Sequence, residues 1–157
     1  VMEGVRPVLA EIQALVVPSS FGNPRRVSNG VEYNRAMLLL AVLEKRGGLL
    51  LGNCDAYLNV IGGLSLDEPA ADLAAMLALA SSFRDKPVPS GLAAIGDVDL
   101  TGELRAVSNL GQRLSEVRRL GFTKCLIPKR IQGKLAAPEG LELIRVANIR
   151  EALAALL

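Results

Sequence analysis

The sequence of 157 residues contains no histidine, no tryptophan, only five other aromatic residues and two cysteines. Without histidine, Ser-His-Asp and Cys-His catalysis are excluded, together with most metal-ligand sets. Cys54 and Cys125 lie far apart and form no C-x-x-C pair, so we expect reduced thiols, no disulfide framework and no metal site. Five aromatic side chains are too few for an extensive platform on which nucleic-acid bases could stack.

Two further absences concern nucleotides and membranes. The sequence has no G-x-x-x-x-G-K-[ST] motif, because Gly133-Lys134 is followed by Leu135, so no P-loop nucleotide site is expected. The longest nearly apolar stretch, residues 36–43, is much shorter than the ~20 residues that span a bilayer. The first residues do not resemble a signal peptide. We therefore expect a cytoplasmic protein without a membrane partner.

Half of the residues are apolar, mostly Leu, Val, Ile and Ala, which suits a single domain over residues 1–157 with a substantial core. A strand pattern that begins almost at residue 1 suggests a domain taken from a longer protein. Strands and helices are expected to alternate without repeats, which favours a two-layer α/β (α+β) fold with a mixed sheet packed by helices.

The local patterns predict individual elements. Alternation of apolar and polar residues predicts a long strand over 5–17, and the Pro, Ser, Gly and Asn content of 18–29 predicts a loop or open hairpin. Helical spacing predicts helices over 31–46, about 67–83, 109–120 and up to residue 156, the last capped by Asn148. Further strands are predicted over 57–61, 92–104 (with a turn at Thr101-Gly102), 124–128 and 141–146.

Positive charge is concentrated in residues 105–134, which we call the basic segment. It holds eight cations and one anion, a net charge of +7, whereas the rest of the chain carries −5. Such a concentration suits contact with phosphates. Helical spacing prevents Arg113, Arg118 and Arg119 from sharing one stripe, so part of this charge is assigned to a solvated surface or to pairing between subunits.

Arg25 and Arg26 form a second basic site, inside the polar loop 18–29. The pair is either a solvated loop tip or, repeated around a ring, a phosphate-binding lining. The candidate DNA-binding residues are thus Arg25, Arg26, Arg113, Arg118, Arg119, Lys124, Lys129 and Arg130.

Two segments carry a more specific pattern, Asp67-Glu68-Pro69-Ala70-Ala71-Asp72 and residues 100–111, LTGELRAVSNLG. On their own, the carboxylates of the first complement a helix dipole and Pro69 suits a first turn. Together the segments resemble the two motifs that hold the Ser-Lys dyad of the Lon protease domain, with Ala70 in place of the serine and Gly111 in place of the lysine. Neither residue supplies a nucleophile or a base, so the resemblance implies a domain that is not a peptidase.

Three serines, Ser65, Ser108 and Ser115, are the alternative nucleophiles, but the sequence places no lysine or histidine base beside them. An active peptidase is therefore the weakest hypothesis, behind the DNA-contacting domain and the purely structural domain that are described below.

Blocks along nearly the whole chain resemble the C-terminal, Lon-protease-like domain of the RadA (Sms) family of bacterial DNA repair proteins. They are residues 13–16, 18–22, 24–26, 34–35, 41–46, 67–74, 84–89 and 120–122. The resemblance implies a ribosomal-protein-like fold. The family's zinc finger and RecA-like ATPase core have no counterpart in this sequence, so ATP, Mg and Zn are expected only in a missing N-terminal part of the parent protein.

The resemblance also implies a function. Members of the family are hexameric, helicase-like ATPases of homologous recombination and branch migration, so this domain is expected to support a hexameric ring and to contact single-stranded or branched DNA without sequence preference. RecA recombinase is a further candidate partner. In the alternative, the domain only supplies ring contacts, and the basic segment pairs with acidic residues near Asp67, Glu68 and Asp97 of a neighbour.

Overall fold

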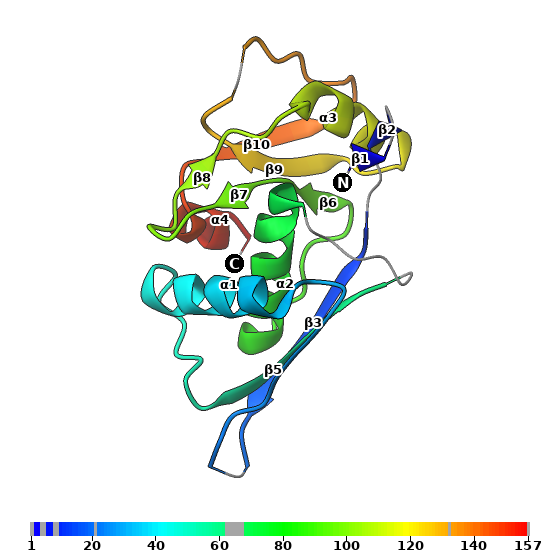
Figure 1. Cartoon of the computed structure of the whole chain (residues 1–157). Coiled ribbons are helices and arrows are strands. Elements are labelled where there is room, and N and C mark those ends of the chain that lie inside the picture. The colour runs from blue at the N-terminus through cyan, green and yellow to red at the C-terminus, as the bar shows by residue number, and fades with distance from the viewer. Residues whose placement is uncertain are drawn as a thin grey trace.

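Helix α2 (Asp72–Arg84) lies between two small β-sheets and contributes to the main core that joins them (Figure 1). The computed structural model describes residues 2–3, 6–7, 10–20, 22–61, 68–131 and 133–156. The element bounds are β1 Met2–Glu3, β2 Arg6–Pro7, β3 Ile12–Pro18, β4 Arg26–Asn29, α1 Tyr33–Lys45, β5 Cys54–Val60, the 3-10 helix η1 Pro69–Ala71, α2, β6 Leu92–Ala94, β7 Asp97–Val98, β8 Leu104–Arg105, α3 Leu110–Arg119, β9 Lys124–Pro128, β10 Glu142–Val146 and α4 Ile149–Leu156.

The first sheet has the strand order β3-β5-β4 and is mixed. β3 runs antiparallel to β5, from Ile12 opposite Val60 to Pro18 opposite Cys54, whereas β4 runs parallel to β5. Alternate residues of β3 and β5 face α2, and the buried members Val16, Ala56, Leu58 and Val60 join the main core. α1 packs beside α2 and β4, with its N-terminus capped by the Glu32 carboxylate, which accepts from the backbone N–H of Arg35 at 3.0 Å.

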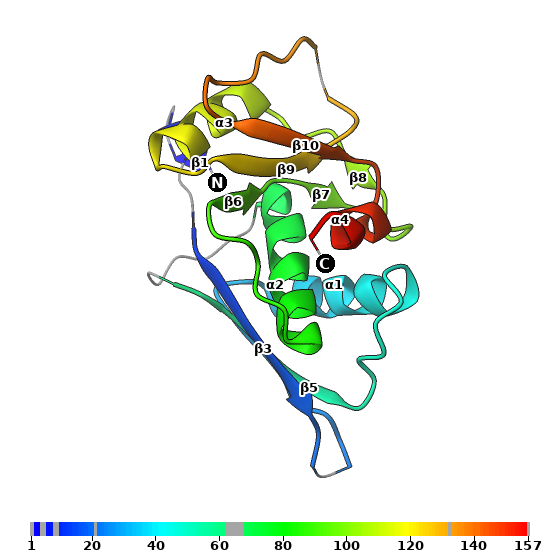
Figure 2. The same cartoon turned by 180° about the vertical axis from the view of Figure 1, so that it is seen from behind.

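The second sheet, β10-β9-β6, is entirely parallel. Its central strand β9 is buried on both faces: Leu126 faces the main core, while Cys125 and Ile127 belong to a second core with Leu114 of α3. α3 covers one face of the sheet, and α2 and α4 lie at the other (Figures 1 and 2). Burial raises the pKa of the Cys125 thiol to about 12, so this thiol is not a reactive group.

A short hairpin, β7-β8, lies between β6 and α3 in the chain. The Asp99 carboxylate accepts from the backbone N–H groups of Thr101 (2.9 Å) and Glu103 (3.1 Å), which closes the turn predicted at Thr101-Gly102. Asn148 caps α4 as predicted, since its Oδ1 accepts from the N–H of Glu151 at 2.8 Å.

The mixed α/β class and the four predicted helices are confirmed, the second as η1 followed by α2. Three predictions were wrong in part. The strand predicted over 92–104 is divided into β6, which pairs with β9, and the hairpin β7-β8. Residues 26–29 form the strand β4 instead of a loop, because they pair with the distant strand β5. Of the predicted strand over 5–17, β2 covers residues 6–7, residues 10–11 are not in a strand, and β3 begins at Ile12. Val5, Val8 and Leu9 lie outside the described residues. Within the described ranges, no helix is long and apolar enough to cross a membrane.

Candidate functional site

The two segments that resemble the Lon motifs come together at one end of the second core. Ala70, in η1, is only 6% exposed, and its methyl group packs in the same apolar cluster as Leu110, at the start of α3. Gly111 is the next residue of α3, and a Cβ placed on it would meet no atom within 4 Å. The position that corresponds to the serine therefore holds the buried methyl group of Ala70. The position that corresponds to the lysine holds Gly111, which has open space beside it on the first turn of α3.

An ion pair joins the same two segments. Arg113 Nη2 lies 2.9 Å from Glu68 Oε1, and Arg113 Nε donates to the backbone carbonyl of Ser108 at 2.9 Å. The Arg113 side chain is 4% exposed, because it lies on the inner face of α3 beside Leu114 and Val117. Arg113 was predicted to bind DNA, but its guanidinium faces Glu68 and not the surface, so a phosphate cannot reach it in this conformation.

Neither described serine near the two motifs is hydrogen-bonded to a base, although Lys134 lines the same hollow as Ser115 and Gly111. Ser115 Oγ donates to the Gly111 carbonyl at 3.1 Å, one turn back along α3, and Ser108 is exposed with its carbonyl bound to Arg113. Ser65, like Asp67, lies outside the described residues. In the part of the chain that the structure covers, no lysine bonds to either hydroxyl.

A second ion pair links α1 to α2. The Arg35 guanidinium forms a bidentate pair with the buried Asp72 carboxylate and lies 3.4 Å from Asp97. Asp72 also accepts from the backbone N–H of Val98 at 3.1 Å. Burial raises the pKa of Asp72 to about 6 although Arg35 opposes this shift, and the bond with Asp72 raises the pKa of Arg35. Sequence reasoning missed this pair; the signal was a carboxylate in the first turn of a helix that is otherwise almost entirely apolar.

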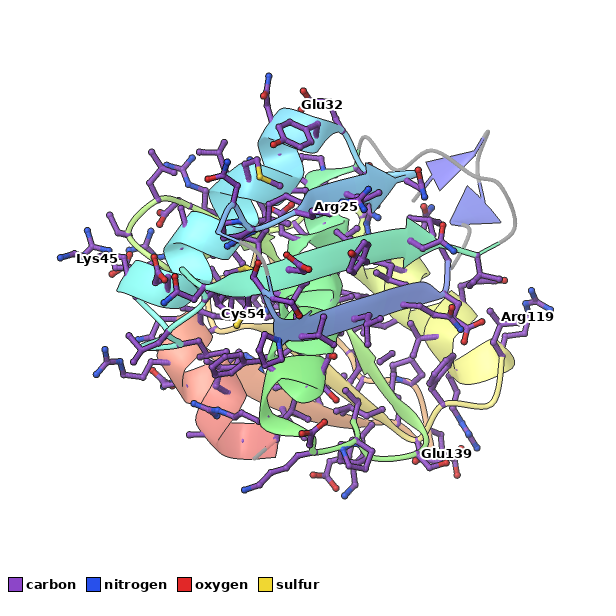
Figure 3. The ribbon with its side chains drawn as sticks, turned by 90° about the horizontal axis from the view of Figure 1, so that it is seen from below. Arg25, Glu32, Lys45, Cys54, Arg119 and Glu139 are labelled. Carbon is purple, nitrogen blue, oxygen red and sulfur yellow. The ribbon has the colours of Figure 1, made fainter. Side chains whose placement is uncertain are left out.

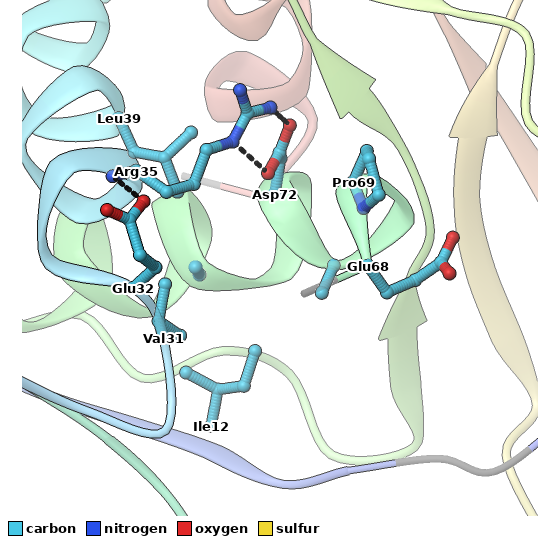
Figure 4. Close-up of a pocket in the computed structure, with 10 residues that line it drawn as sticks. Ile12, Val31, Glu32, Arg35, Leu39, Glu68, Pro69 and Asp72 are labelled. Carbon is cyan, nitrogen blue, oxygen red and sulfur yellow. Dashed lines mark hydrogen bonds and ion pairs between the residues drawn. The ribbon is translucent and has the colours of Figure 1, made fainter. Parts of the chain in front are cut away.

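A cavity of about 230 Å³ lies beside this pair (Figure 4). Ile12, Val31 and Leu39 form its apolar wall, and Glu32, Arg35 and Asp72 its polar wall. The Glu68 side chain points away from Arg35 and Asp72 in Figure 4, which agrees with its bond to Arg113. The polar groups of the cavity are thus committed to one another or to helix capping.

Most of the eight candidate DNA-binding residues are bonded within the chain. Arg118 donates to the carbonyls of Glu139 (3.1 Å) and Phe122 (3.3 Å), and Arg119 pairs with Glu116. Lys129 Nζ lies 3.7 Å from Glu151, although its side chain stays 62% exposed. Lys124 and Arg130 are exposed and, within the described residues, have no ion pair or side-chain hydrogen bond. Lys134, which was counted in the basic segment but not chosen as a site residue, is exposed in the same way.

The two arginines of the 18–29 segment differ from each other. Arg26 is half-buried, and its Nη2 donates to the Leu51 carbonyl at 2.8 Å. Arg25 carries a bond on its backbone N–H, to Asp55 Oδ1 at 2.7 Å. Arg25 lies on the β3-β5-β4 side of the molecule, whereas α3, β9 and the loop after β9 form its opposite end (Figures 1 and 3). The structure therefore does not bring the two basic sites together.

Comparison with known proteins assigns the chain to a family. The sequence model of the Lon protease (S16) C-terminal proteolytic domain matches residues 55–157, about two thirds of the chain, including both motif segments. The chain belongs to this Lon protease domain family. In the part of this Lon-type domain that the structure covers, no cluster of three or more Cys, Asp or Glu side chains could hold a metal ion.

Curated relatives are more specific. The chain is 56% identical over 152 residues to the DNA repair protein RadA of Bacillus subtilis and 51% identical to those of Streptococcus pneumoniae and Listeria monocytogenes. Each match covers 97% of this chain but only 33–36% of the relative, so the chain spans about a third of the length of these proteins. These matches confirm the prediction of a RadA-type Lon-like domain.

Proposed function

We propose that this chain is a catalytically silent Lon-type domain that serves a DNA repair protein by contacting DNA. The observation that carries the proposal is a set of exposed cations at the α3-β9 end, Lys124, Arg130 and Lys134, which form no ion pair within the described part of the chain. Glu142 is the cross-strand neighbour of Lys124, so Arg130 and Lys134 carry most of the argument. Cations that no neighbouring carboxylate holds are available to phosphates, and release of the phosphate counterions drives such binding.

Catalytic silence follows from the chemistry of Ala70 and Gly111 at the proposed dyad positions. A fluorophosphonate probe and unfolded casein test it. We expect labelling and cleavage no greater than with heat-denatured protein; specific labelling of a serine would refute this part of the proposal.

The wider role is proposed from the relatives, which are named DNA repair proteins. In this proposal the parent protein is a cytoplasmic, hexameric ATPase of recombination and branch migration. Its ATP, Mg and Zn sites lie outside this chain, and RecA is a candidate partner. The domain adds ring contacts and a DNA-contacting surface that is indifferent to base sequence, because the surface offers charges and few aromatic side chains.

Fluorescence anisotropy with a labelled duplex tests the DNA contact. Three phosphate contacts predict a slope of log K against log [salt] of about −2.7, or a roughly 40-fold loss of affinity between ~50 and ~200 mM salt. Replacing Arg130 or Lys134 with Ala should each make the slope less steep by about 1. Lys86→Ala removes an exposed cation from the loop after α2 and serves as the matched control. No binding at the lower salt concentration, or equal effects of Lys86→Ala and Arg130→Ala, would refute the proposed surface.

A purely structural domain is the second candidate, and one observation favours it. Five of the eight predicted DNA-binding residues are bonded within the chain through their side chains, namely Arg26, Arg113, Arg118, Arg119 and Lys129. In that case the solution mass would report an assembly that shows no DNA affinity at any salt concentration. A mass measurement with and without a short single strand separates the two candidates.

A further inference from the structure

A hollow of about 510 Å³ lies between the first turns of α3 and the loop that follows β9. These two segments lie at one end of the molecule (Figures 1 and 2). The apolar part of the lining is formed by side chains that belong to the second core or pack against it, namely Val107, Leu110, Ile131 and Leu135. The volume is within the ~300–1,000 Å³ range of small-molecule sites, so the hollow has room for one nucleoside-sized group.

The rim of the hollow is polar. Asn109, Gln112, Ser115 and Lys134 line it, and all four are exposed. Among the residues that the structure describes, the side-chain amides of Asn109 and Gln112 have no hydrogen-bond partner. Each amide carries two donors and an acceptor, which is the combination that hydrogen-bonds the edges of nucleic-acid bases. The rim therefore fits a ligand that presents donors and acceptors side by side.

The hollow is continuous with the cations of the proposed DNA surface. Lys134 lies on its rim, and Arg130 directly precedes Ile131 of its apolar lining. A strand whose phosphates contact these two cations brings its bases beside the hollow. The bases of a duplex are paired and stacked, whereas a base of a single strand leaves its stack at a lower cost. The neighbouring charges therefore favour an unpaired base of DNA over an uncharged ligand as the occupant.

We propose that this hollow receives one unpaired base of single-stranded DNA while Arg130 and Lys134 contact phosphates of the same strand. The proposal rests on the proposed function, since it uses the same two cations. Every base has an apolar face that aliphatic side chains can contact, and the rim amides can donate or accept. The site therefore distinguishes single strands from duplexes and does not distinguish one base sequence from another.

Gly111 gives access to a direct test, because it lines the hollow and a Cβ placed on it would meet no atom within 4 Å. Gly111→Leu takes up part of the volume, changes no charge and favours the helix relative to glycine. In fluorescence anisotropy, this variant should bind an oligothymidine strand roughly tenfold more weakly than the wild type and a duplex equally well. Ala41→Leu, which also enlarges an exposed helix residue, is the matched control and should change neither affinity. Circular dichroism confirms that each variant is folded.

A strand of abasic sites provides a second measurement, because it keeps the phosphates and removes the bases. The wild type should bind this strand about as weakly as Gly111→Leu binds the intact strand, and Gly111→Leu should weaken its binding no further. Equal affinities of wild type and Gly111→Leu for the intact strand, or an equal loss for strand and duplex, would overturn the base site and leave the proposed DNA surface standing. If neither the strand nor the duplex binds at low salt, the base site and the proposed function both fail.

Discussion

The buried Arg113–Glu68 pair allows a direct measurement of what holds the two motif segments together. Arg113→Met keeps an apolar stem of similar length but removes the ion pair and the bond to the Ser108 carbonyl, both 2.9 Å long. Removing one member of a fully buried pair costs about 3–5 kcal/mol. Glu68 is 26% exposed and regains contact with water, so we expect a loss of roughly 2–3 kcal/mol in the free energy of unfolding. For a domain of this size that corresponds to a decrease in Tm of about 5–10 °C.

The assay is urea unfolding followed by circular dichroism. Arg130→Ala is the control variant, for which the effects on stability and on DNA affinity should be reversed. Arg130 is exposed and has no partner in the described structure, so its removal should change stability by no more than about 0.5 kcal/mol. DNA affinity should respond in the opposite order: Arg130→Ala weakens it, whereas Arg113→Met leaves it unchanged while the protein is folded. Glu68→Gln combined with Arg113→Met should cost less than the sum of the single changes. A loss below about 0.5 kcal/mol for Arg113→Met would refute the reasoning.

Two further predictions concern a titration and a glycine. Because burial raises the pKa of Asp72 from 3.8 to about 6, the native state binds more protons than the unfolded state between these values. The free energy of unfolding of the wild type should therefore fall, relative to Asp72→Asn, as the pH rises from about 4 to 6, by at most about 3 kcal/mol; a parallel pair of pH profiles would disprove the assignment. Gly140 has φ +85°, and a Cβ there would lie 2.7 Å from Arg118 Nη2. Gly140→Ala should cost about 1–2 kcal/mol in urea unfolding, and a loss below about 0.5 kcal/mol would show that this contact adapts freely.

Elements with strong local signals could be predicted from the sequence. β9 was predicted with its observed bounds, because an apolar run between Gly121 and Pro128 leaves few alternatives. α1 and α3 were predicted to within about two residues. By contrast, β4 carries the composition of a loop, and only pairing with β5, some thirty residues away, makes it a strand.

The site was predictable as a pair of positions but not as a set of contacts. Ala70 and Gly111 were identified by their place in the motifs, and the structure brings their segments together. The burial of Arg113 could not be predicted, because the sequence shows its charge but not which face of α3 meets Glu68, 45 residues earlier. The same holds for Arg35, whose partner Asp72 is 37 residues away. Such pairings depend on the tertiary fold.

The position of β9 has a consequence for how the molecule is made. Its two parallel neighbours, β6 and β10, come from segments about 30 residues before and 20 residues after it. While the chain leaves the ribosome, β9 emerges with one edge and much of its apolar surface uncovered, and it stays so until β10 and α4 have been translated. Sheets whose strands come from such distant segments form slowly, and until they are complete their unpaired strand edges can pair with other chains. Release of a nascent chain that stops short of residue 146 should therefore yield an aggregation-prone product that depends on chaperones.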